Sequence, residues 1–441
     1  MSNRNPESKD ELRKLIVKLL RRIAQINTLP PESKKIQDII AFEDKRLGYV
    51  AYQTVMEISS SEGTWTLADR DEPLWDEVVA KLSDLNPKVY STRKLNEMLT
   101  DFVWKFQSKG WRLSGILQDA EALISSVKDA DVFARRIFLP IWGLFVDVSP
   151  FAVGDADFIP RAKHKKIDEE LSKWESVRNE PELSRVKTLA VTKATGGDDY
   201  MIVQNAEDKV NQALNILRTF LYPIVPRATL KQMGIVGSFY SLHKDYFVEV
   251  TDTSKGKACS KPEAYAGHEL SGINNMVITP YVKEMVLDKS GFNKLTELLT
   301  SSNTSQLQRS LLRGAEWLGE ATKPDTLESK FIKIALALDA MLGEASDIIP
   351  DKGIKARIAE RSAFLLAHIG EKREGIYREI GGFVTKRNSL VHGRTVRVSQ
   401  WEVERFGAYV FTVLKRLLLG DPTFNSIREL DTWVRRTSFR G

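Results

Sequence analysis

The stretch Ser399–Pro422, SQWEVERFGAYVFTVLKRLLLGDP, decides the fold of the C-terminal part of the chain. Ser399 and Glu402 have the spacing of a capping box, in which two side chains bond backbone N–H groups at the start of a helix. Gly420 before Pro422 is a typical helix end. Between them, apolar residues recur on one side at helical intervals: Val403, Phe406, Val410, Leu414 and Leu417. A helix with one apolar face needs other helices to cover that face.

Three segments upstream supply such helices, at residues 324–344, 354–370 and 372–393. The first, PDTLESKFIKIALALDAMLGE, has Asp325 as its expected N-cap with Glu328 three residues later. Its predicted apolar face contains Phe331, Ile332, Leu336, Leu338 and Leu342. The predicted buried stripe of the third helix contains Ile376, Ile380, Phe383, Val384, Leu390 and Val391. We therefore expect a helical bundle over residues 289–441.

The rest of the chain has two different patterns. Amphipathic helices are predicted over 8–23, 36–56, 73–85 and 92–107, within an N-terminal helical region 1–130. From residue 131 to 288, short runs rich in Val, Ile, Phe and Trp are typical of strands, as far as PYVKEMVL at 280–287. ATGGDD, at 194–199, is expected to turn a hairpin, and a helix over 205–221 to pack on the sheet. The predicted class is α+β, mainly α, with a central α+β sheet domain for sensing or substrate binding.

Composition limits the possible functions. The chain has 441 residues and a single cysteine, Cys259, which excludes a disulfide framework and a thiolate metal cluster. We expect no metal, no cofactor and no membrane segment, and the polar N-terminus favours a cytoplasmic protein. Residues 351–441 hold 18 Lys and Arg against 10 Asp and Glu. Such a basic excess attracts polyanions such as nucleic acid, although a solvated basic face fits the charge equally well.

Arg387 interrupts the apolar stripe of the third helix, four residues after Phe383 and four before Val391. A buried, unpaired guanidinium is costly. It therefore either pairs with an acidic residue of its own bundle or faces an anion such as a phosphate. Asn388 and His392 share the neighbouring row, so the amide can orient the imidazole.

Arg361 and His368 repeat this spacing loosely. The residues between them are apolar and no asparagine follows the arginine, which favours a structural role for His368.

GFVTKRNSLVHG, preceded by KFIKIALALDAML and followed by SQWEVERFGAYVFTVLKRLLL, resembles the HEPN domains, specifically the Apea-like branch found in bacterial anti-phage abortive-infection proteins. The signature of that family, Arg and a polar residue followed by three variable residues and His, maps onto Arg387, Asn388 and His392. The resemblance covers about residues 305–420. It implies a HEPN-like bundle and a metal-independent endoribonuclease that works as a homodimer.

The resemblance also implies roles for individual residues. His392 would act as general base or acid, Arg387 would stabilise phosphoryl charge, and Asn388 would hold the histidine or a phosphate. Asp339 is the expected acidic companion on the preceding helix, and a structural salt bridge to an arginine is the alternative role. Basic residues beside the motif are expected to bind RNA: Lys386, Arg394 and Arg397.

The implied partners are RNA, with tRNA among the candidates, a second copy of the chain, and a phage-derived trigger or regulatory protein. Two other functions stay open: a non-catalytic RNA- or nucleotide-binding dimerisation module, and a sensor dominated by the α+β domain.

Overall fold

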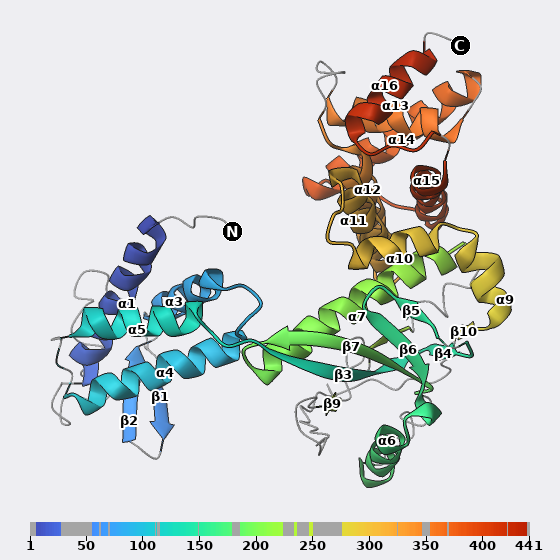
Figure 1. The fold of residues 1–441 in the computed structure, drawn as a ribbon. Helices are drawn as coiled ribbons and strands as arrows, with labels where there is room; N and C mark the ends of the chain where they lie inside the picture. The colour runs from blue at the N-terminus through green and yellow to red at the C-terminus, as the bar shows by residue number, and fades with distance from the viewer. Residues whose placement is uncertain are drawn as a thin grey trace. The chain divides into compact units, whose positions relative to one another are not determined.

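The computed structural model confirms an α+β chain made mainly of helices (Figure 1). Two compact units are present, one of residues 1–134 and 194–205, the other of residues 135–193 and 206–441. The separation of the sheet from the bundle at residue 288 stays a prediction. The structure describes residues 6–27, 55–60, 63–68, 71–110, 112, 115–148, 150–178, 186–223, 233–235, 247–249, 276–323, 325–345, 353–367, 370–420 and 422–438.

Helices dominate the first unit, as the N-terminal pattern predicted. They are α1 (Pro6–Asn27), α3 (Glu72–Leu85), α4 (Thr92–Ser108) and α5 (Ile116–Lys128). Their apolar faces form one core, in which Ile16, Val78, Leu99 and Val103 are fully buried. The predicted helices near 8–23, 73–85 and 92–107 are therefore confirmed.

A β-hairpin in this unit was not predicted. Strands β1 (Val55–Ser60) and β2 (Gly63–Ala68) pair antiparallel, from Val55 opposite Ala68 to Ser60 opposite Gly63. The helix predicted over 36–56 lies mostly outside the described residues, and its last two positions, 55 and 56, belong to β1 instead. The apolar residues Val55, Met56 and Ile58 suit helical spacing as well as strand alternation, so periodicity alone did not separate the two.

The predicted hairpin turn at 194–199 is also wrong. Strand β7 (Thr188–Gly196) is followed directly by helix α7 (Asp199–Leu221). Asp198 caps the helix, because its Oδ1 accepts a bond from the Met201 backbone N–H at 3.0 Å. The same carboxylate accepts bonds from the backbone N–H and hydroxyl of Ser91, at 2.8 and 3.0 Å. The glycines thus serve a strand-to-helix turn.

The sheet lies almost entirely in the second unit. Its strands run in the order β5–β6–β7–β3–β8, and β9 also pairs with β3, while β4 and β10 form a separate parallel pair. Their bounds are β3 (Phe133–Trp142), β4 (Leu144–Val146), β5 (Ala152–Val153), β6 (Ala156–Pro160), β8 (Gly234–Ile235), β9 (Phe247–Glu249) and β10 (Met276–Ile278). Helix α6 (Lys165–Arg178) buries Ile167 and Leu171 against this sheet.

The strand predicted at 280–287 is helical. A short helix, α9 (Pro280–Val282), continues into a π-helical turn, η5 (Lys283–Asp288). Thr279 caps it, since its hydroxyl accepts a bond from the Val282 N–H at 3.2 Å. Thr followed by Pro at the first helical position is a helix-start signal that outweighs the strand propensity of the apolar residues after it.

The C-terminal helices include the four that the apolar periodicity predicted and three more. They are α10 (Phe292–Thr300), α11 (Gln306–Ala321), α12 (Leu327–Leu342), α13 (Ile354–Leu366), α14 (Gly370–Val391), α15 (Gln400–Leu419) and α16 (Ile427–Ser438). The capping box of Ser399 and Glu402 is confirmed. The N-cap of α12 is Thr326, one residue after the predicted Asp325. Three aromatic rings, of Phe331, Phe383 and Phe406, join α12, α14 and α15 at centroid distances of 4.8 to 5.9 Å.

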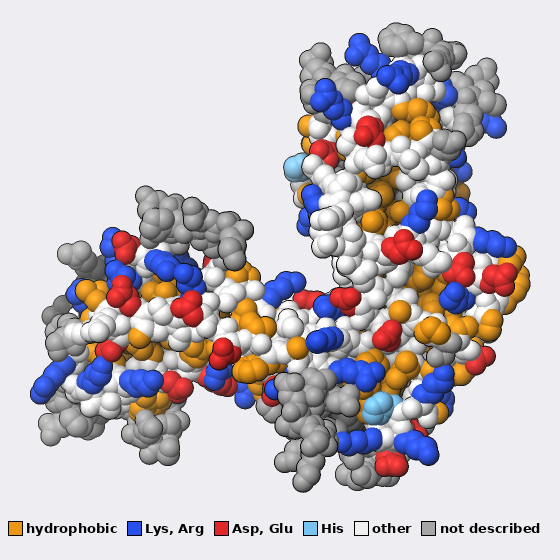
Figure 2. Space-filling view, in the orientation of Figure 1, with side chains coloured by type: hydrophobic (Ala, Val, Ile, Leu, Met, Phe, Trp, Pro, Cys, Tyr) orange, Lys and Arg blue, Asp and Glu red, His pale blue; other side chains and the backbone are white. Residues whose placement is uncertain are grey.

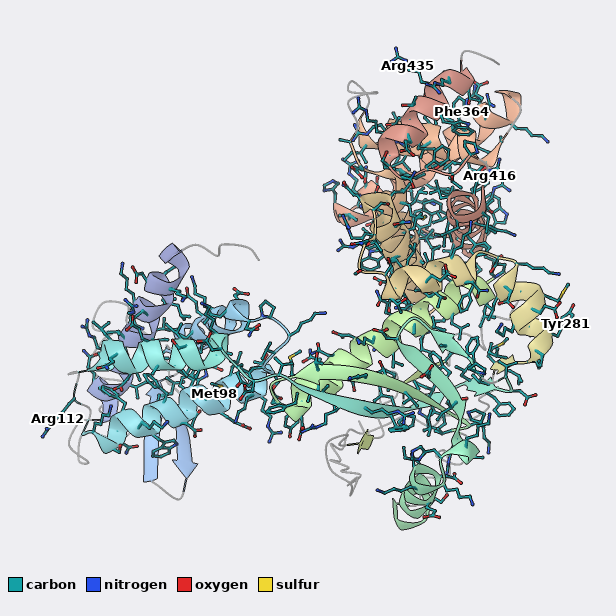
Figure 3. The ribbon with its side chains drawn as sticks, viewed as in Figure 1. Met98, Arg112, Tyr281, Phe364, Arg416 and Arg435 are labelled. Carbon is teal, nitrogen blue, oxygen red and sulfur yellow. The ribbon has the colours of Figure 1, made fainter. Side chains whose placement is uncertain are left out.

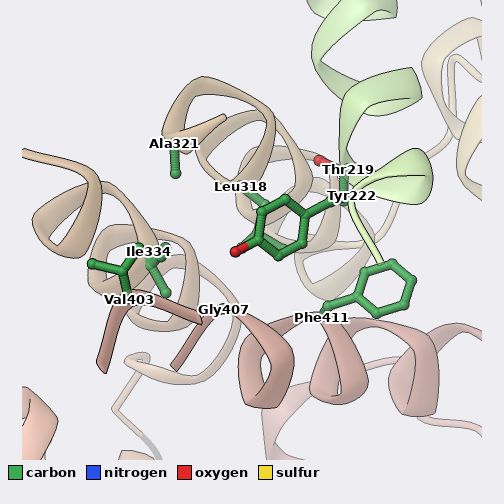
Figure 4. Close-up of a pocket in the computed structure, with 8 residues that line it drawn as sticks. All are labelled: Thr219, Tyr222, Leu318, Ala321, Ile334, Val403, Gly407 and Phe411. Atoms are coloured by element: carbon green, nitrogen blue, oxygen red, sulfur yellow. The ribbon is translucent and has the colours of Figure 1, made fainter. Parts of the chain in front are cut away.

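Helix α7 of the sheet region packs closely on α11 of the bundle. The Thr219 hydroxyl donates to the Ala315 carbonyl at 2.7 Å, and the Asn215 amide donates to Glu320 at 2.7 Å. Burial lowers the pKa of Arg218 to about 10, against the opposing charge of Glu320. Beside this contact, Tyr222 points into a small apolar pocket between α7, α11, α12 and α15 (Figure 4). Sheet region and bundle therefore share polar and apolar contacts.

Candidate functional site

The last turn of α14 is fixed by a Schellman motif, a common helix ending. The Gly393 N–H bonds the Leu390 carbonyl at 3.0 Å, and the Arg394 N–H bonds the Ser389 carbonyl at 2.9 Å. Gly393 has a φ of 73°, in the left-handed region that glycine adopts without strain. His392 is the last residue before this turn, where its N–H bonds the Asn388 carbonyl at 3.0 Å, and its side chain is exposed.

Arg387 lies one turn earlier and is held by its own bundle. Its Nη2 donates to Oδ2 of Asp339 on α12 at 2.6 Å, and its Nη1 donates to Oδ1 of Asn388 at 3.0 Å. The side chains of Arg387 and Asp339 keep 23% and 27% of their surface exposed. Of the two possibilities that the sequence left open, the internal acidic partner is the one present.

The ion pair leaves part of the guanidinium unused. Nε of Arg387 is buried and has no hydrogen-bond partner in the part of the chain that the structure describes. Guanidinium has five N–H donors, of which the contacts to Asp339 and Asn388 use two. The second N–H groups of Nη1 and Nη2, in a side chain that is 23% exposed, can bind an anionic oxygen.

Asp339 has an environment that disfavours its charge. Burial raises the pKa of this carboxyl group above its ordinary value, and the neighbouring positive charge of Arg387 opposes that rise without cancelling it. A carboxyl group with a raised pKa holds its proton to higher pH than an exposed aspartate does. Asp339 therefore anchors the arginine, while burial disfavours its own negative charge.

The apolar stripe of α14 is covered along only part of its length. Ile380, Phe383 and Val384 are buried as predicted, but Leu390 is half-buried and Val391 is 56% exposed. Burial was also predicted for Ile376, which is half-buried, so the prediction is wrong for Ile376, Leu390 and Val391. Periodicity shows which face is apolar, but not how far the neighbouring helices extend. An uncovered apolar end therefore continues past Arg387.

The predicted RNA-binding residues have two different environments. Lys386 is paired with Glu402 of α15, so its charge is already engaged. Arg394 and Arg397 are exposed on the segment that joins α14 to α15. Asn388 was predicted to orient His392, but its Oδ1 accepts a bond from Arg387 instead.

Arg361 shows what a purely structural arginine looks like in this bundle. Its Nε and Nη2 donate to the two carboxylate oxygens of Asp431 at 2.7 and 2.6 Å, and both side chains are completely buried. Its Nη1 donates to the carbonyls of Leu342 and Glu344. The structural role was predicted for His368, which lies outside the described residues.

Sequence reasoning missed a cluster on the exposed seam between α14 and α15. It contains Glu379, Trp401, Arg405 and Tyr409. The spacing of 401, 405 and 409, each four residues apart, puts three large side chains on one face of α15 and is a signal that could have been used.

The basic excess of the C-terminal part is spread over the bundle. Figure 2 shows Lys and Arg side chains over the visible face of its helices, with Asp and Glu among them. Arg416 on α15 and Arg435 on α16 are two of these basic residues (Figure 3). Positive charge alone therefore does not single out the end of α14.

Two properties of the described residues bear on other classes of function. Within those ranges, no three or more His, Cys, Asp or Glu side chains are grouped so that they could hold a metal ion. None of the helices that the structure describes is long and apolar enough to cross a membrane. Cys259 lies outside the described ranges.

Comparison of the chain with protein-family models, with curated proteins and with solved structures finds no match.

Proposed function

We propose that the protein is a metal-independent endoribonuclease of the HEPN type, with its active site at the end of α14. The observation that carries the proposal is the cluster of Arg387, Asp339 and Asn388, about one helical turn before the exposed His392. It combines a cation with unused donors, a carboxyl group of raised pKa and an exposed imidazole. The resemblance to Apea-like HEPN domains supports the same assignment.

The chemistry follows from these groups. The imidazole of His392 takes the proton of a ribose 2′-OH, and the 2′-oxygen attacks the neighbouring phosphorus. The bond from phosphorus to the 5′-oxygen breaks, a protonated imidazole returns a proton to that oxygen, and a 2′,3′-cyclic phosphate remains. The free donors of Arg387 stabilise charge on the phosphoryl oxygens. DNA lacks the 2′-OH, so it should not be cut.

The proposed active form is a homodimer through the bundle. Its support is the uncovered apolar end of α14, where Val391 is exposed beside the arginine. A second copy packed there would bring two motifs together around one RNA strand. Following the resemblance, we further propose a cytoplasmic toxin of anti-phage abortive infection, held inactive until a phage-derived trigger or a regulatory partner acts. The central sheet region would then sense the trigger or select the RNA, tRNA included.

Incubation of the purified protein with total RNA in EDTA tests the proposal. We expect cleavage in EDTA that falls about 10²–10⁴-fold in His392→Ala and about 10²–10³-fold in Arg387→Ala. His164→Ala is the matched control, because His164 lies outside the bundle beside Phe138 and should not affect cleavage. Cleavage by His392→Ala at the wild-type rate would overturn the assignment. Wild-type cleavage that occurs only when a metal ion is added would overturn it too.

The Arg387–Asp339 ion pair also favours a second function, a non-catalytic module that binds RNA or a nucleotide. In that case the pair is a structural contact that keeps the end of α14 in place. Wild-type protein that binds RNA without cutting it would support this second function and exclude the first.

A further inference from the structure

Trp401 is an unusual surface residue. It lies in the first turn of α15, and 60% of its surface is exposed. The segment before it carries the exposed Arg394 and Arg397, and Val398 is buried and anchors that segment to the bundle. A large aromatic ring thus follows two available cations within a few residues.

The exposed ring is held in position by its own helix. The Arg405 guanidinium lies 5.3 Å from the centre of the Trp401 ring and 5.2 Å from that of Tyr409. Both carboxylate oxygens of Glu379 on α14 bind Arg405, one of them at 2.9 Å from Nη2. The Tyr409 hydroxyl donates to the same carboxylate at 2.8 Å. These bonds fix the guanidinium against which the ring lies, and a ring beside a fixed group needs less ordering when a ligand binds.

The ring is also linked to the candidate active site. Glu402, the next residue after Trp401, accepts bonds from the backbone N–H and hydroxyl of Ser399, both at 2.9 Å, and pairs with Lys386. Lys386 directly precedes Arg387 in α14. One carboxylate therefore joins the turn that carries the tryptophan to the turn that carries the proposed catalytic arginine.

The surroundings of the ring fit a nucleotide. A flat aromatic surface binds the face of a base, and arginines bind the phosphates beside it. The residues one helical turn after Trp401, Glu404 and Arg405, are exposed and charged, so the neighbours of the ring on its own helix are not apolar. In a duplex, the faces of the bases are already stacked, which leaves only unpaired bases available.

We propose that Trp401 stacks on an unpaired base of the RNA while Arg394 and Arg397 bind the phosphates next to it. The substrate class is then RNA with a single-stranded segment at the cleavage site, such as a loop, and not continuous duplex. This inference rests on the proposed function for the place of cleavage, but the binding itself does not require catalysis.

The test measures binding in the His392→Ala background by fluorescence anisotropy, with a labelled single-stranded RNA oligonucleotide and the same strand in a duplex. Trp401→Ala should weaken binding of the single strand about 10-fold or more, and Trp401→Phe should restore most of it. Arg394→Gln and Arg397→Gln should each weaken the salt dependence of binding, so that the magnitude of the slope of log affinity against log salt concentration falls by about 0.7. Tyr281→Ala is the matched control, because Tyr281 is an exposed aromatic residue, 69% accessible, on α9.

Unchanged affinity of Trp401→Ala, or equal loss with Tyr281→Ala, would overturn the inference. A change of oligomeric state in Trp401→Ala, measured by analytical ultracentrifugation, with RNA affinity intact would also overturn it and assign the ring to protein contact. Trp401-dependent binding by a wild-type protein that cuts no RNA would support the inference while the proposed nuclease function fails.

Discussion

Arg361 and Arg387 belong to the same bundle, and the structure predicts different results when each is replaced by alanine. Arg361 and Asp431 are both 0% exposed, and four hydrogen bonds surround the guanidinium. Arg361→Ala leaves a buried carboxylate and two carbonyls without their donor, which should cost about 3–5 kcal/mol of unfolding free energy. Arg387 is partly exposed, so screening by water limits the loss in Arg387→Ala to about 1 kcal/mol.

Native-state hydrogen exchange of amides in α12 and α13 measures these free energies, because it reports on the bundle separately from the first unit. We expect Arg361→Ala to lower protection throughout both helices, and Arg387→Ala to leave it nearly intact while RNA cleavage is lost. Equal destabilisation by the two substitutions would refute the reasoning. Arg387 would then be a structural residue, and loss of cleavage in Arg387→Ala would reflect unfolding.

Two further predictions concern single contacts in the second unit. Burial disfavours the charge of Glu402, but bonds from Lys386 and Ser399 outweigh it and keep its pKa below the ordinary 4.5. Its stabilisation is therefore present above pH 4.5 and lost as pH falls through the lower folded value. Glu402→Gln should cost about 1 kcal/mol in urea unfolding at pH 7. The same substitution should lower the free energy of unfolding by less at pH 3. An equal difference between wild type and Glu402→Gln at both pH values would contradict this explanation.

Gly319→Ala should lower the free energy of unfolding by about 1–3 kcal/mol, because the new Cβ would overlap the backbone carbonyl of Asn215 on α7. Gly407→Ala is the matched control, since the nearest atom to its Cβ would be a side-chain atom, the Tyr222 hydroxyl oxygen at 3.2 Å. Thermal unfolding should therefore occur at a lower temperature in Gly319→Ala than in Gly407→Ala.

The helices of the bundle were predictable because their signals are local. The capping box at Ser399 and the apolar rows of α12 and α15 lie within one helix each, so sequence spacing is enough to find them. Asp339 and Arg387 were both named from sequence, and the structure brings them into contact.

The contacts between elements were not predictable in the same way. The engagement of Lys386 by Glu402 depends on how α14 and α15 align, and no spacing within either helix shows it. The turn at 194–199 was misread because two glycines and two aspartates serve a hairpin or a helix start equally well, and the capping contact of Asp198 is visible only in three dimensions. The exposure of Val391 depends on where the neighbouring helices stop.

The close contact of α7 and α11 has a consequence for anyone who wants to study the bundle alone. A fragment that begins at residue 289 would keep α11 but lose α7, which packs against it. Glu320 would then lose the hydrogen bond that it accepts from the Asn215 amide. The glycine at 319, which lets two backbones touch, would face solvent and only weaken its own helix. The bundle therefore depends on α7 for its stability, and a fragment made to study it should begin upstream of α7.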